Sequence, residues 1–303
     1  MSPTVARARR IRLDQLLVER GLAANRSRAQ ALLLGARVRV GEGDAARADR
    51  KPGDLVDPAT PVRLVARDPY VSRGGHKLAA ALDAFGIDPA GRVCLDVGAS
   101  TGGFTDVLLQ RGAARVYALD VGRGQLADRL RANPRVVSME RTNARVLGPA
   151  VLPEPVAIAV VDVSFISLAR VLAPIAGTFD RNAGGPIVAL VKPQFEAGRG
   201  RAEGGVVRDP AIHREVLDRV ARDAAGLGLR PAGLIASPLL GPEGNREFLL
   251  GLDVPPGWPN APAPDPDGQA AAHPVAQPVA LPEEWPSWVA AVVPGMSQGM
   301  AQG

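Results

Sequence analysis

Short apolar runs alternate with turns and amphipathic segments along the middle of the chain. The run at residues 93–97 is followed by Gly98, Gly102 and Gly103, and a helical pattern begins at Phe104. Apolar runs of this length indicate buried strands. Glycines directly after a strand let the backbone approach a ligand closely. The pattern therefore predicts a strand, a glycine loop and a helix that together bind a nucleotide-like molecule.

The spacing of the glycines and the position of the next acidic residue narrow the choice of ligand. The loop reads Gly-x-x-x-Gly-Gly, whereas the NAD fingerprint is Gly-x-Gly-x-x-Gly, so NAD is disfavoured. Asp96 lies inside the end of the first strand, and Asp120 ends the next apolar run. Such folds place an acid about 20 residues after the loop, on ribose hydroxyls. The alternative for Asp120 is a helix N-cap.

Two later apolar runs also end in charged residues. Residues 156–161 are followed by Asp162, and residues 187–191 by Lys192, where Pro193 stops the strand. Runs that are apolar on both faces indicate central parallel strands, whose carboxyl ends face the ligand crevice. We therefore expect Asp162 and Lys192 to lie together at the edge of the sheet that also carries the glycine loop.

The same alternation continues over the rest of the middle region. A stretch rich in Gly and Arg, residues 197–206, predicts a mobile loop over the site. A turn-rich connection, residues 238–247, leads into a last strand and places Glu247 near the crevice. We expect helices at residues 79–85, 125–131, 167–179 and 209–226 and strands at residues 135–139 and 232–237. The fold class is α/β, a Rossmann-like arrangement with a mostly parallel central sheet.

Positive charge is concentrated at the start of the chain. Residues 1–67 contain 14 basic and 7 acidic side chains, whereas the remainder contains 22 basic and 24 acidic ones. An arginine-rich composition alone would not produce this asymmetry, so the first segment is expected to meet an anionic partner. Cys94 is the single cysteine, which excludes an internal disulfide, and the three histidines form no metal-binding motif. No apolar stretch is long enough to span a bilayer, so we expect a cytoplasmic protein without a membrane or metal partner.

The first segment has a compact pattern of its own. Helical spacing at residues 12–21 and 25–35 is followed by alternation at residues 37–40, and short strands are expected near residues 55–56 and 62–65. This order resembles the S4 RNA-binding domain, a small α+β fold, although Gly41-Glu42-Gly43 replaces the usual Asn-Gly turn. The resemblance implies phosphate contacts, which add affinity but little sequence information, from Arg26, Arg28, Arg37 and Arg39. The alternative for each arginine is a solvated basic face.

Several separated motifs in the longer second region resemble the TlyA family, FtsJ-like ribosomal RNA 2′-O-methyltransferases that carry an S4 domain. The resemblance covers residues 9–252. Its motifs are Ser72-Arg73-Gly74-Gly75-x-Lys77-Leu78, residues 96–105, Val161-Asp162-Val163-Ser164-Phe165, Leu190-Val191-Lys192-Pro193-Gln194-Phe195-Glu196 and the stretch from Ser237 to Phe248. It implies S-adenosylmethionine as cofactor, ribosomal RNA or ribosomal subunits as partner, and a catalytic tetrad of Lys77, Asp162, Lys192 and Glu247.

The implied chemistry gives each residue a role. A ribose hydroxyl is a very weak acid, so its attack on a methyl group needs in-line positioning and removal of a proton. We assign Lys192 as general base and Lys77 as the residue that orients the hydroxyl or assists the base. Asp120 would hold the ribose of the cofactor, Asn143 would lie near its adenine, and Asp96 would contact its ammonium indirectly or tie down the loop. The methionine part would be surrounded by Gly98, Ser100, Thr101, Gly102, Gly103 and Phe104.

The predicted organisation is a flexible start at residues 1–8, an S4-like domain at 9–68, a methyltransferase domain at 69–252 and a disordered tail at 253–303. The final fifty residues hold 11 of the 28 prolines, and a weak helix around residues 285–293 is the one expected exception. We expect a monomer. The alternatives are a haemolysin, which would need an amphipathic or apolar insertion segment, a non-catalytic RNA-binding protein, and a base methyltransferase, which would carry Asn/Asp-Pro-Pro-Tyr where this chain has Asp162-Val163-Ser164-Phe165.

Overall fold

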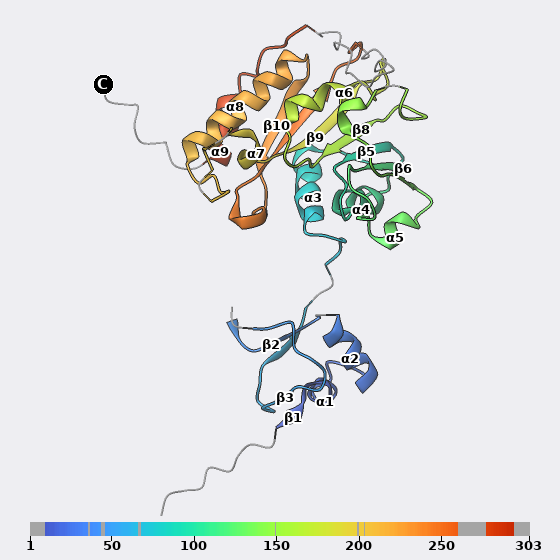
Figure 1. The fold of residues 1–303 in the computed structure, drawn as a ribbon, viewed down its shortest axis with the longest axis vertical. Helices are drawn as coiled ribbons and strands as arrows, with labels where there is room; N and C mark the ends of the chain where they lie inside the picture. The colour runs from blue at the N-terminus through green and yellow to red at the C-terminus, as the bar shows by residue number, and fades with distance from the viewer. Residues whose placement is uncertain are drawn as a thin grey trace, which may run out of the picture. The chain divides into compact units, whose positions relative to one another are not determined.

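The computed structural model divides into two compact units, Met1–Pro69 and Tyr70–Gly303 (Figure 1). It describes residues 10–35, 37–43, 46–65, 68–148, 150–198, 200–202, 204–259 and 277–293. The predicted flexible start at residues 1–8 lies outside these ranges. Each unit has its own hydrophobic core and is described separately.

The first unit is a small α+β fold with two short antiparallel strand pairs. Its elements are β1 (Ile11–Arg12), α1 (Leu13–Glu19), α2 (Arg26–Leu34), β2 (Val38–Val40), β3 (Leu55–Val56) and β4 (Val62–Leu64). Strand β1 pairs with β3, and β2 pairs with β4. Asn25 caps α2, because its side chain accepts a hydrogen bond from the Arg28 N–H. Leu13, Leu17 and Val38 are among the apolar side chains that form the core between the helices and strands.

The second unit is built on a seven-stranded sheet of order β10-β11-β9-β8-β5-β6-β7. Every pairing is parallel except those of β11, which runs antiparallel to both β9 and β10. The expected mostly parallel α/β sheet is thus confirmed. The strands are β5 (Val93–Val97), β6 (Arg115–Leu119), β7 (Val136–Met139), β8 (Ile158–Val161), β9 (Gly185–Val191), β10 (Arg230–Ala236) and β11 (Phe248–Val254).

Helices cover both faces of this sheet. On one face Cys94 of β5 packs with α3 (Gly74–Phe85) and α4 (Gly103–Gln110). On the other face its neighbour Leu95 packs with α6 (Leu172–Ala176) and α8 (Pro210–Gly226). Successive strand residues point to opposite faces, so a strand that is apolar at every position must be buried on both. The remaining short helices are α5 (Asp128–Arg131), α7 (Pro193–Glu196), η2 (Ala144–Val146), η3 (Leu168–Arg170) and η4 (Pro242–Gly244).

Two predicted helices differ in the structure. The helix expected over residues 167–179 is split into η3 and α6, because Pro174 has no N–H for the carbonyl of Arg170 and its ring crowds that position. The helix expected over residues 125–131 begins only at Asp128. Just before Asp128, the Leu126 side chain fills the space that a side chain at position 102 would need. This stretch therefore packs against the glycine loop and does not join the helix.

The prediction of a disordered tail from residue 253 was wrong for the part of the tail that the structure describes. Strand β11 continues to Val254, and the buried Trp258 donates a hydrogen bond from Nε1 to the Leu227 carbonyl at 3.0 Å. Helix α9 (Trp285–Val292) confirms the expected exception and buries Trp285 and Val289 in the main core. Composition averaged over fifty residues hides these anchors, because a few tryptophans bury a large apolar area. Residues 260–276 and 294–303 lie outside the described ranges.

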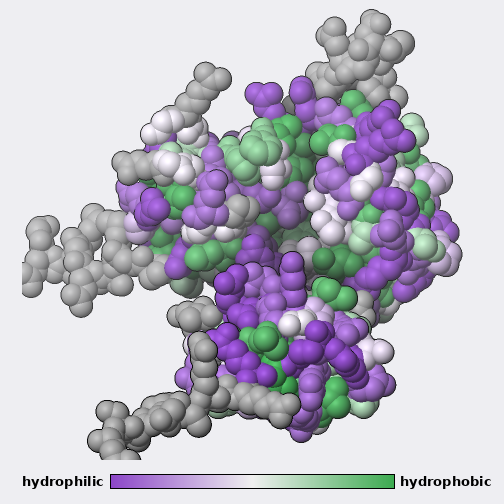
Figure 2. Space-filling model, turned by 60° about the horizontal axis from the view of Figure 1, so that its bottom comes forward, coloured by the Kyte–Doolittle hydropathy of each residue, from purple (hydrophilic) through white to green (hydrophobic). Residues whose placement is uncertain are grey.

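The surface is mostly hydrophilic on the face that Figure 2 shows, with apolar side chains in small separate patches. Within the described ranges, no helix has both the length and the apolar character needed to cross a membrane.

Candidate active site

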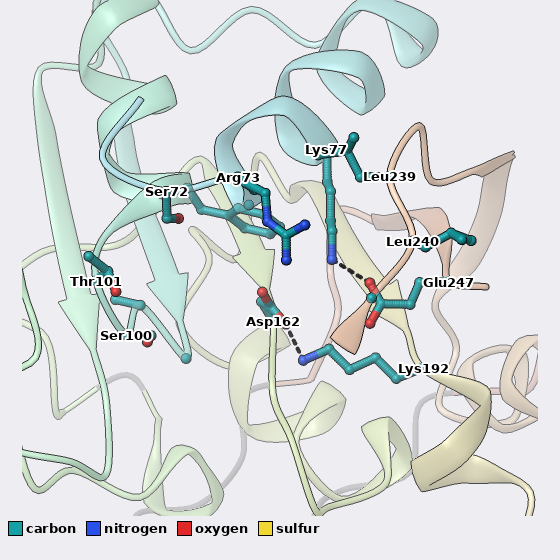
Figure 3. Close-up of a pocket in the computed structure, with 16 residues that line it drawn as sticks. Ser72, Arg73, Lys77, Ser100, Thr101, Asp162, Lys192, Leu239, Leu240 and Glu247 are labelled. Atoms are coloured by element: carbon teal, nitrogen blue, oxygen red, sulfur yellow. Dashed lines mark hydrogen bonds and ion pairs between the residues drawn. The ribbon is translucent and has the colours of Figure 1, made fainter. Parts of the chain in front are cut away.

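A cavity of about 290 Å³ opens at the carboxyl ends of the central strands. Its wall combines the glycine loop after β5, the start of α3, the ends of β8 and β9, and the connection from β10 to β11 (Figure 3). It is lined by Ser72, Arg73, Gly74, Lys77, Gly98, Ala99, Ser100, Thr101, Gly103, Phe104, Asp162, Lys192, Leu239, Leu240, Gly241 and Glu247. All four residues of the predicted tetrad therefore lie around one cavity.

The tetrad forms two lysine–carboxylate pairs. The Nζ atom of Lys192 lies 2.6 Å from Oδ1 of Asp162, and Lys77 forms an ion pair with Glu247. Figure 3 shows the four side chains pointing toward one another. The Glu247 side chain is fully buried and that of Lys77 is 10% exposed, whereas Asp162 is 25% exposed. The Lys77–Glu247 pair is therefore enclosed, whereas the Lys192–Asp162 pair reaches the solvent side of the cavity.

Strand register explains why these residues meet. Parallel strands β8 and β9 pair Val161 with Ala189, so their carboxyl ends lie side by side. Antiparallel β11 pairs Phe248 with Val191, which places Glu247 at the same sheet edge as Lys192. The sequence predicted the places of Asp162 and Lys192 from the strands that they follow. The place of Glu247 depended on the connection from β10 to β11, which brings β11 antiparallel to β9.

Lysine is rare in this chain, which makes the two lysines of the cavity stand out. The chain has only three lysines, Lys51, Lys77 and Lys192, and arginine supplies the rest of its basic side chains. Two of the three line this cavity. Arginine keeps its proton in proteins, whereas the lysine amine can release one when its surroundings change. A chain that otherwise uses arginine thus places lysine where a proton could be exchanged.

The glycine loop holds its shape through close backbone contacts. Gly98 has φ 85°, and a Cβ atom there would lie 2.3 Å from the Asp162 carbonyl oxygen, so only glycine fits. Gly98, Ser100, Thr101, Gly103 and Phe104, which the sequence assigned to the methionine part of the cofactor, line the cavity. Gly102 (φ 97°) is not on the cavity wall and instead makes room for Leu126 and Leu130.

Asp120 fastens this loop. Its Oδ2 accepts a hydrogen bond from Ser100 N at 2.8 Å, and its Oδ1 accepts one from Gly122 N at 2.7 Å. The N-cap alternative was wrong, because the next helix begins at Asp128 with Ala127 in the N-cap position. Each carboxylate oxygen can accept a second hydrogen bond, so Asp120 retains capacity for a ligand hydroxyl.

A second, small cavity lies beside Asp120. Its wall includes Gln125, Ser138 and Glu140, none of which sequence reasoning identified. Glu140 directly follows β7, so the rule that acids at strand ends face the crevice could have found it. Asn143 lines neither cavity, and its side chain accepts a hydrogen bond from Arg145 N at the start of η2. The predicted place of Asn143 near the adenine has no support from this arrangement.

Asp96 is completely buried beneath the glycine loop. Its Oδ2 accepts a hydrogen bond from Thr105 Oγ1 at 2.6 Å, whereas Oδ1 has no hydrogen-bond partner among the described residues. Burial raises the pKa of this carboxyl to about 7. Asp96 lines neither cavity, so this arrangement gives no support to its predicted contact with the donor ammonium, whereas its hydrogen bond to Thr105 in the first turn of α4 agrees with the alternative role of tying down the loop.

The four arginines proposed for RNA belong to the first unit and differ in their contacts. Arg26 lies 3.0 Å from the buried Asp14, and the pKa of that carboxyl is held well below its usual range by Arg12 first, with Gln30 and Arg26 adding to it. The Arg37 and Arg39 side chains donate to the carbonyls of Val65 and Ala46. Arg28 is exposed and makes no side-chain hydrogen bond within the part of the chain that the structure describes.

A mostly parallel sheet with a glycine loop, an acid after the next strand and a crevice at the strand ends defines a Rossmann-like methyltransferase of the α/β class. The family model for FtsJ-like methyltransferases matches residues 70–254. The chain belongs to the FtsJ-like methyltransferase family, and its methyl donor is S-adenosylmethionine.

Individual relatives extend beyond the methyltransferase unit. The chain is 51% identical over 248 residues to a Mycobacterium tuberculosis protein named 16S/23S rRNA (cytidine-2'-O)-methyltransferase TlyA, and the match covers 81% of this chain and 90% of that protein. It is 39% identical to Hemolysin A of Brachyspira hyodysenteriae, over 79% of this chain and 98% of that one. A solved structure from Streptococcus thermophilus, titled as a candidate hemolysin, matches with a TM-score of 0.62 and 42% identity over 82% of this chain and 89% of that one.

Proposed function

We propose that this enzyme methylates the ribose 2′-hydroxyl of cytidine in 16S or 23S ribosomal RNA. The observation that carries the proposal is the meeting of two lysine–carboxylate pairs beside the glycine loop in one cavity. The relative that is 51% identical carries this activity in its name. The acceptor and the roles of the four residues are our inference.

The cavity residues fit S-adenosylmethionine. The donor supplies a methyl group on a positively charged sulfur, which makes the methyl carbon electrophilic. Asp120 lines the small second cavity and has acceptor capacity for the ribose hydroxyls of this molecule. Gly98, Ser100 and Thr101 give the loop its close approach to the ligand.

Lys192 is the general base in this proposal. The bound donor would supply the methyl group that the ribose oxygen takes up, and the hydroxyl proton would pass to Nζ of Lys192 in its neutral amine form. Asp162 lies 2.6 Å from that amine, and Lys77, paired with Glu247, would orient the hydroxyl. Positioning of this kind can supply a large part of the rate.

The first unit would bring the RNA to the site. Its fold of two helices and short strands agrees with the S4-like pattern, and we expect Arg28, Arg37 and Arg39 to meet phosphates. We expect a monomer that works in the cytoplasm, where ribosomal RNA is found.

The haemolysin alternative is not favoured. The relative named for rRNA methylation is more similar to this chain than the one named Hemolysin A, at 51% against 39% identity. A complete set of two lysines and two carboxylates around the cavity also disfavours a non-catalytic RNA-binding protein.

Two substitutions at Lys192 test the assignment of the base. Arginine keeps a positive charge but does not release its proton, so Lys192→Arg and Lys192→Ala should both lose methyl transfer by at least about a thousandfold while binding S-adenosylmethionine within about threefold of wild type. Lys51→Arg is the matched control, because Lys51 belongs to the first unit and is not among the residues that line the cavity. Turnover by Lys192→Arg close to wild type would show that charge, and not proton removal, is what this position provides.

A further inference from the structure

A serine contacts the proposed base directly. Nζ of Lys192 donates a hydrogen bond to Ser164 Oγ at 2.8 Å, in addition to its contact with Asp162. Ser164 lies two residues after Asp162, in the loop between β8 and η3, and it is not on the cavity wall. Its contact with Lys192 therefore comes from a residue outside the cavity lining.

The loop that carries Ser164 is joined to the segment after β9 at three points. Besides the hydrogen bond from Lys192 to Ser164, the rings of Phe165 and Phe195 pack with centroids 4.8 Å apart. Farther along, Leu168 N donates to Oε1 of Glu196 at 2.8 Å. Contacts at both ends of the loop thus fix the place of the Ser164 hydroxyl.

Backbone geometry supports a constrained loop. Phe165 has φ 65°, a left-handed conformation that is rare for an aromatic residue and persists where surrounding contacts hold it. This turn directly follows Ser164. The Lys192 ammonium also lies over the Phe195 ring, 5.9 Å from its centre, where the ring face attracts a cation.

We propose that Ser164 is a positioning residue that sets the direction of the Lys192 amine. The hydroxyl of Ser164 accepts one of the three N–H groups of the ammonium, and the Asp162 carboxylate lies 2.6 Å from Nζ as its ion-pair partner. These two neighbours leave one direction of Nζ for the cavity that Lys192 lines. With one N–H held on Ser164 and another turned toward Asp162, the lone pair of the neutral amine would face the ribose hydroxyl. This inference rests on the proposed role of Lys192 as base.

Three variants separate this role from a structural one. Ser164→Ala removes the acceptor, Ser164→Thr keeps a hydroxyl at an exposed position that has room for a methyl group, and Ser167→Ala removes a hydroxyl from the same loop. The Ser167 hydroxyl accepts from Ala169 N at 3.3 Å and belongs to the start of η3, so it is the matched control.

Single-turnover methyl transfer to the RNA that the wild type methylates is the first readout. We expect Ser164→Ala to slow the step about tenfold, with dissociation constants for S-adenosylmethionine and for the RNA within twofold of wild type. Ser164→Thr should recover most of the rate, and Ser167→Ala should match wild type. A rate for Ser164→Ala within twofold of wild type, or an equal loss in Ser164→Thr, would overturn the proposal. If Lys192→Ala remains active in the same assay, the proposed base is wrong independently of Ser164.

A second readout needs no RNA substrate. Because the chain has three lysines, protein labelled with ¹³C-lysine should give three resolvable side-chain signals by NMR. Ser164→Ala should move the Lys192 signal, Ser164→Thr should restore it, and the Lys51 signal should stay in place throughout. A Lys192 signal that does not respond to Ser164→Ala contradicts the contact on which the inference depends.

Discussion

Lys77 and Glu247 form an ion pair between residues that are 170 positions apart in the chain. Lys77 lies in the first turn of α3, and Glu247 directly precedes β11. The pair therefore joins the first helix of the methyltransferase unit to its last strand, and both side chains line the cavity. In the proposed mechanism the same contact both stabilises the unit and positions the ribose hydroxyl.

Removing one partner of this pair should destabilise the second unit unequally. The Glu247 side chain is fully buried, whereas Lys77 is 10% exposed and can reach water. Lys77→Ala should therefore lower the free energy of unfolding by about 3–5 kcal/mol, and Glu247→Ala by less. Urea unfolding followed by tryptophan fluorescence reports on this unit alone, because Trp258, Trp285 and Trp288 all lie in it. The double variant should be more stable than Lys77→Ala alone, and the reverse order would contradict the account.

Asp96 should make stability depend on pH. Burial raises the pKa of Asp96 from 3.8 to about 7 in the folded state, so the native state holds this proton more strongly than the unfolded chain does. The stability from this group is complete below pH 3.8 and is lost as pH rises through about 7. Wild type should lose roughly 2–4 kcal/mol more than Asp96→Asn between pH 4 and pH 8. Equal pH profiles for the two proteins would show that Asp96 ionises normally.

Helix α9 should be needed for the stability of the methyltransferase unit. Trp285 is 3% exposed, and its Nε1 donates to Asp218 Oδ1 at 2.8 Å. Replacing it with alanine removes a large buried side chain and should cost about 3–5 kcal/mol in the free energy of unfolding. Trp288→Ala is the control, since Trp288 is only partly buried and should cost less. Thermal or urea unfolding of the two variants measures the difference.

Two neighbouring arginines of α2 should behave differently. Arg28→Ala should weaken RNA binding and reduce the slope of log affinity against log salt by about 1, with no change in the stability of the first unit. Arg26→Ala should also destabilise that unit, because it takes a partner from the buried Asp14. Salt titrations of RNA binding, together with unfolding followed by circular dichroism, test both statements. An unchanged salt slope in Arg28→Ala would remove this residue from the RNA surface.

Local sequence signals predicted most of the methyltransferase fold. Strands that are apolar at every position, such as 158–161, required a sheet covered on both faces, and the glycine loop marked the ligand side. The resemblance of several ordered motifs supplied the family, which the comparisons confirmed. The antiparallel direction of β11 and the continuation of the fold to α9 depend on contacts between distant segments.

Part of the candidate site could also be predicted from local sequence signals. Asp162 and Lys192 follow strands, so their meeting could be predicted from periodicity, and the same rule applied to Glu140 after β7. Gln125 and Ser164 acquire their places from loop conformations. Asn143 was assigned by position along the chain, but its side chain caps η2. Loop shape is set by tertiary contacts that a single sequence does not display.

The decisive experiment for the proposed reaction is transfer of labelled methyl from S-adenosylmethionine to 16S RNA, 23S RNA and isolated ribosomal subunits, followed by mapping of the modified nucleotide. We expect a methyl group on a cytidine 2′-oxygen that is absent with Lys192→Ala and present with Lys51→Arg. A methyl group found on a base, or no incorporation into any RNA by a protein that binds the donor tightly, would contradict it.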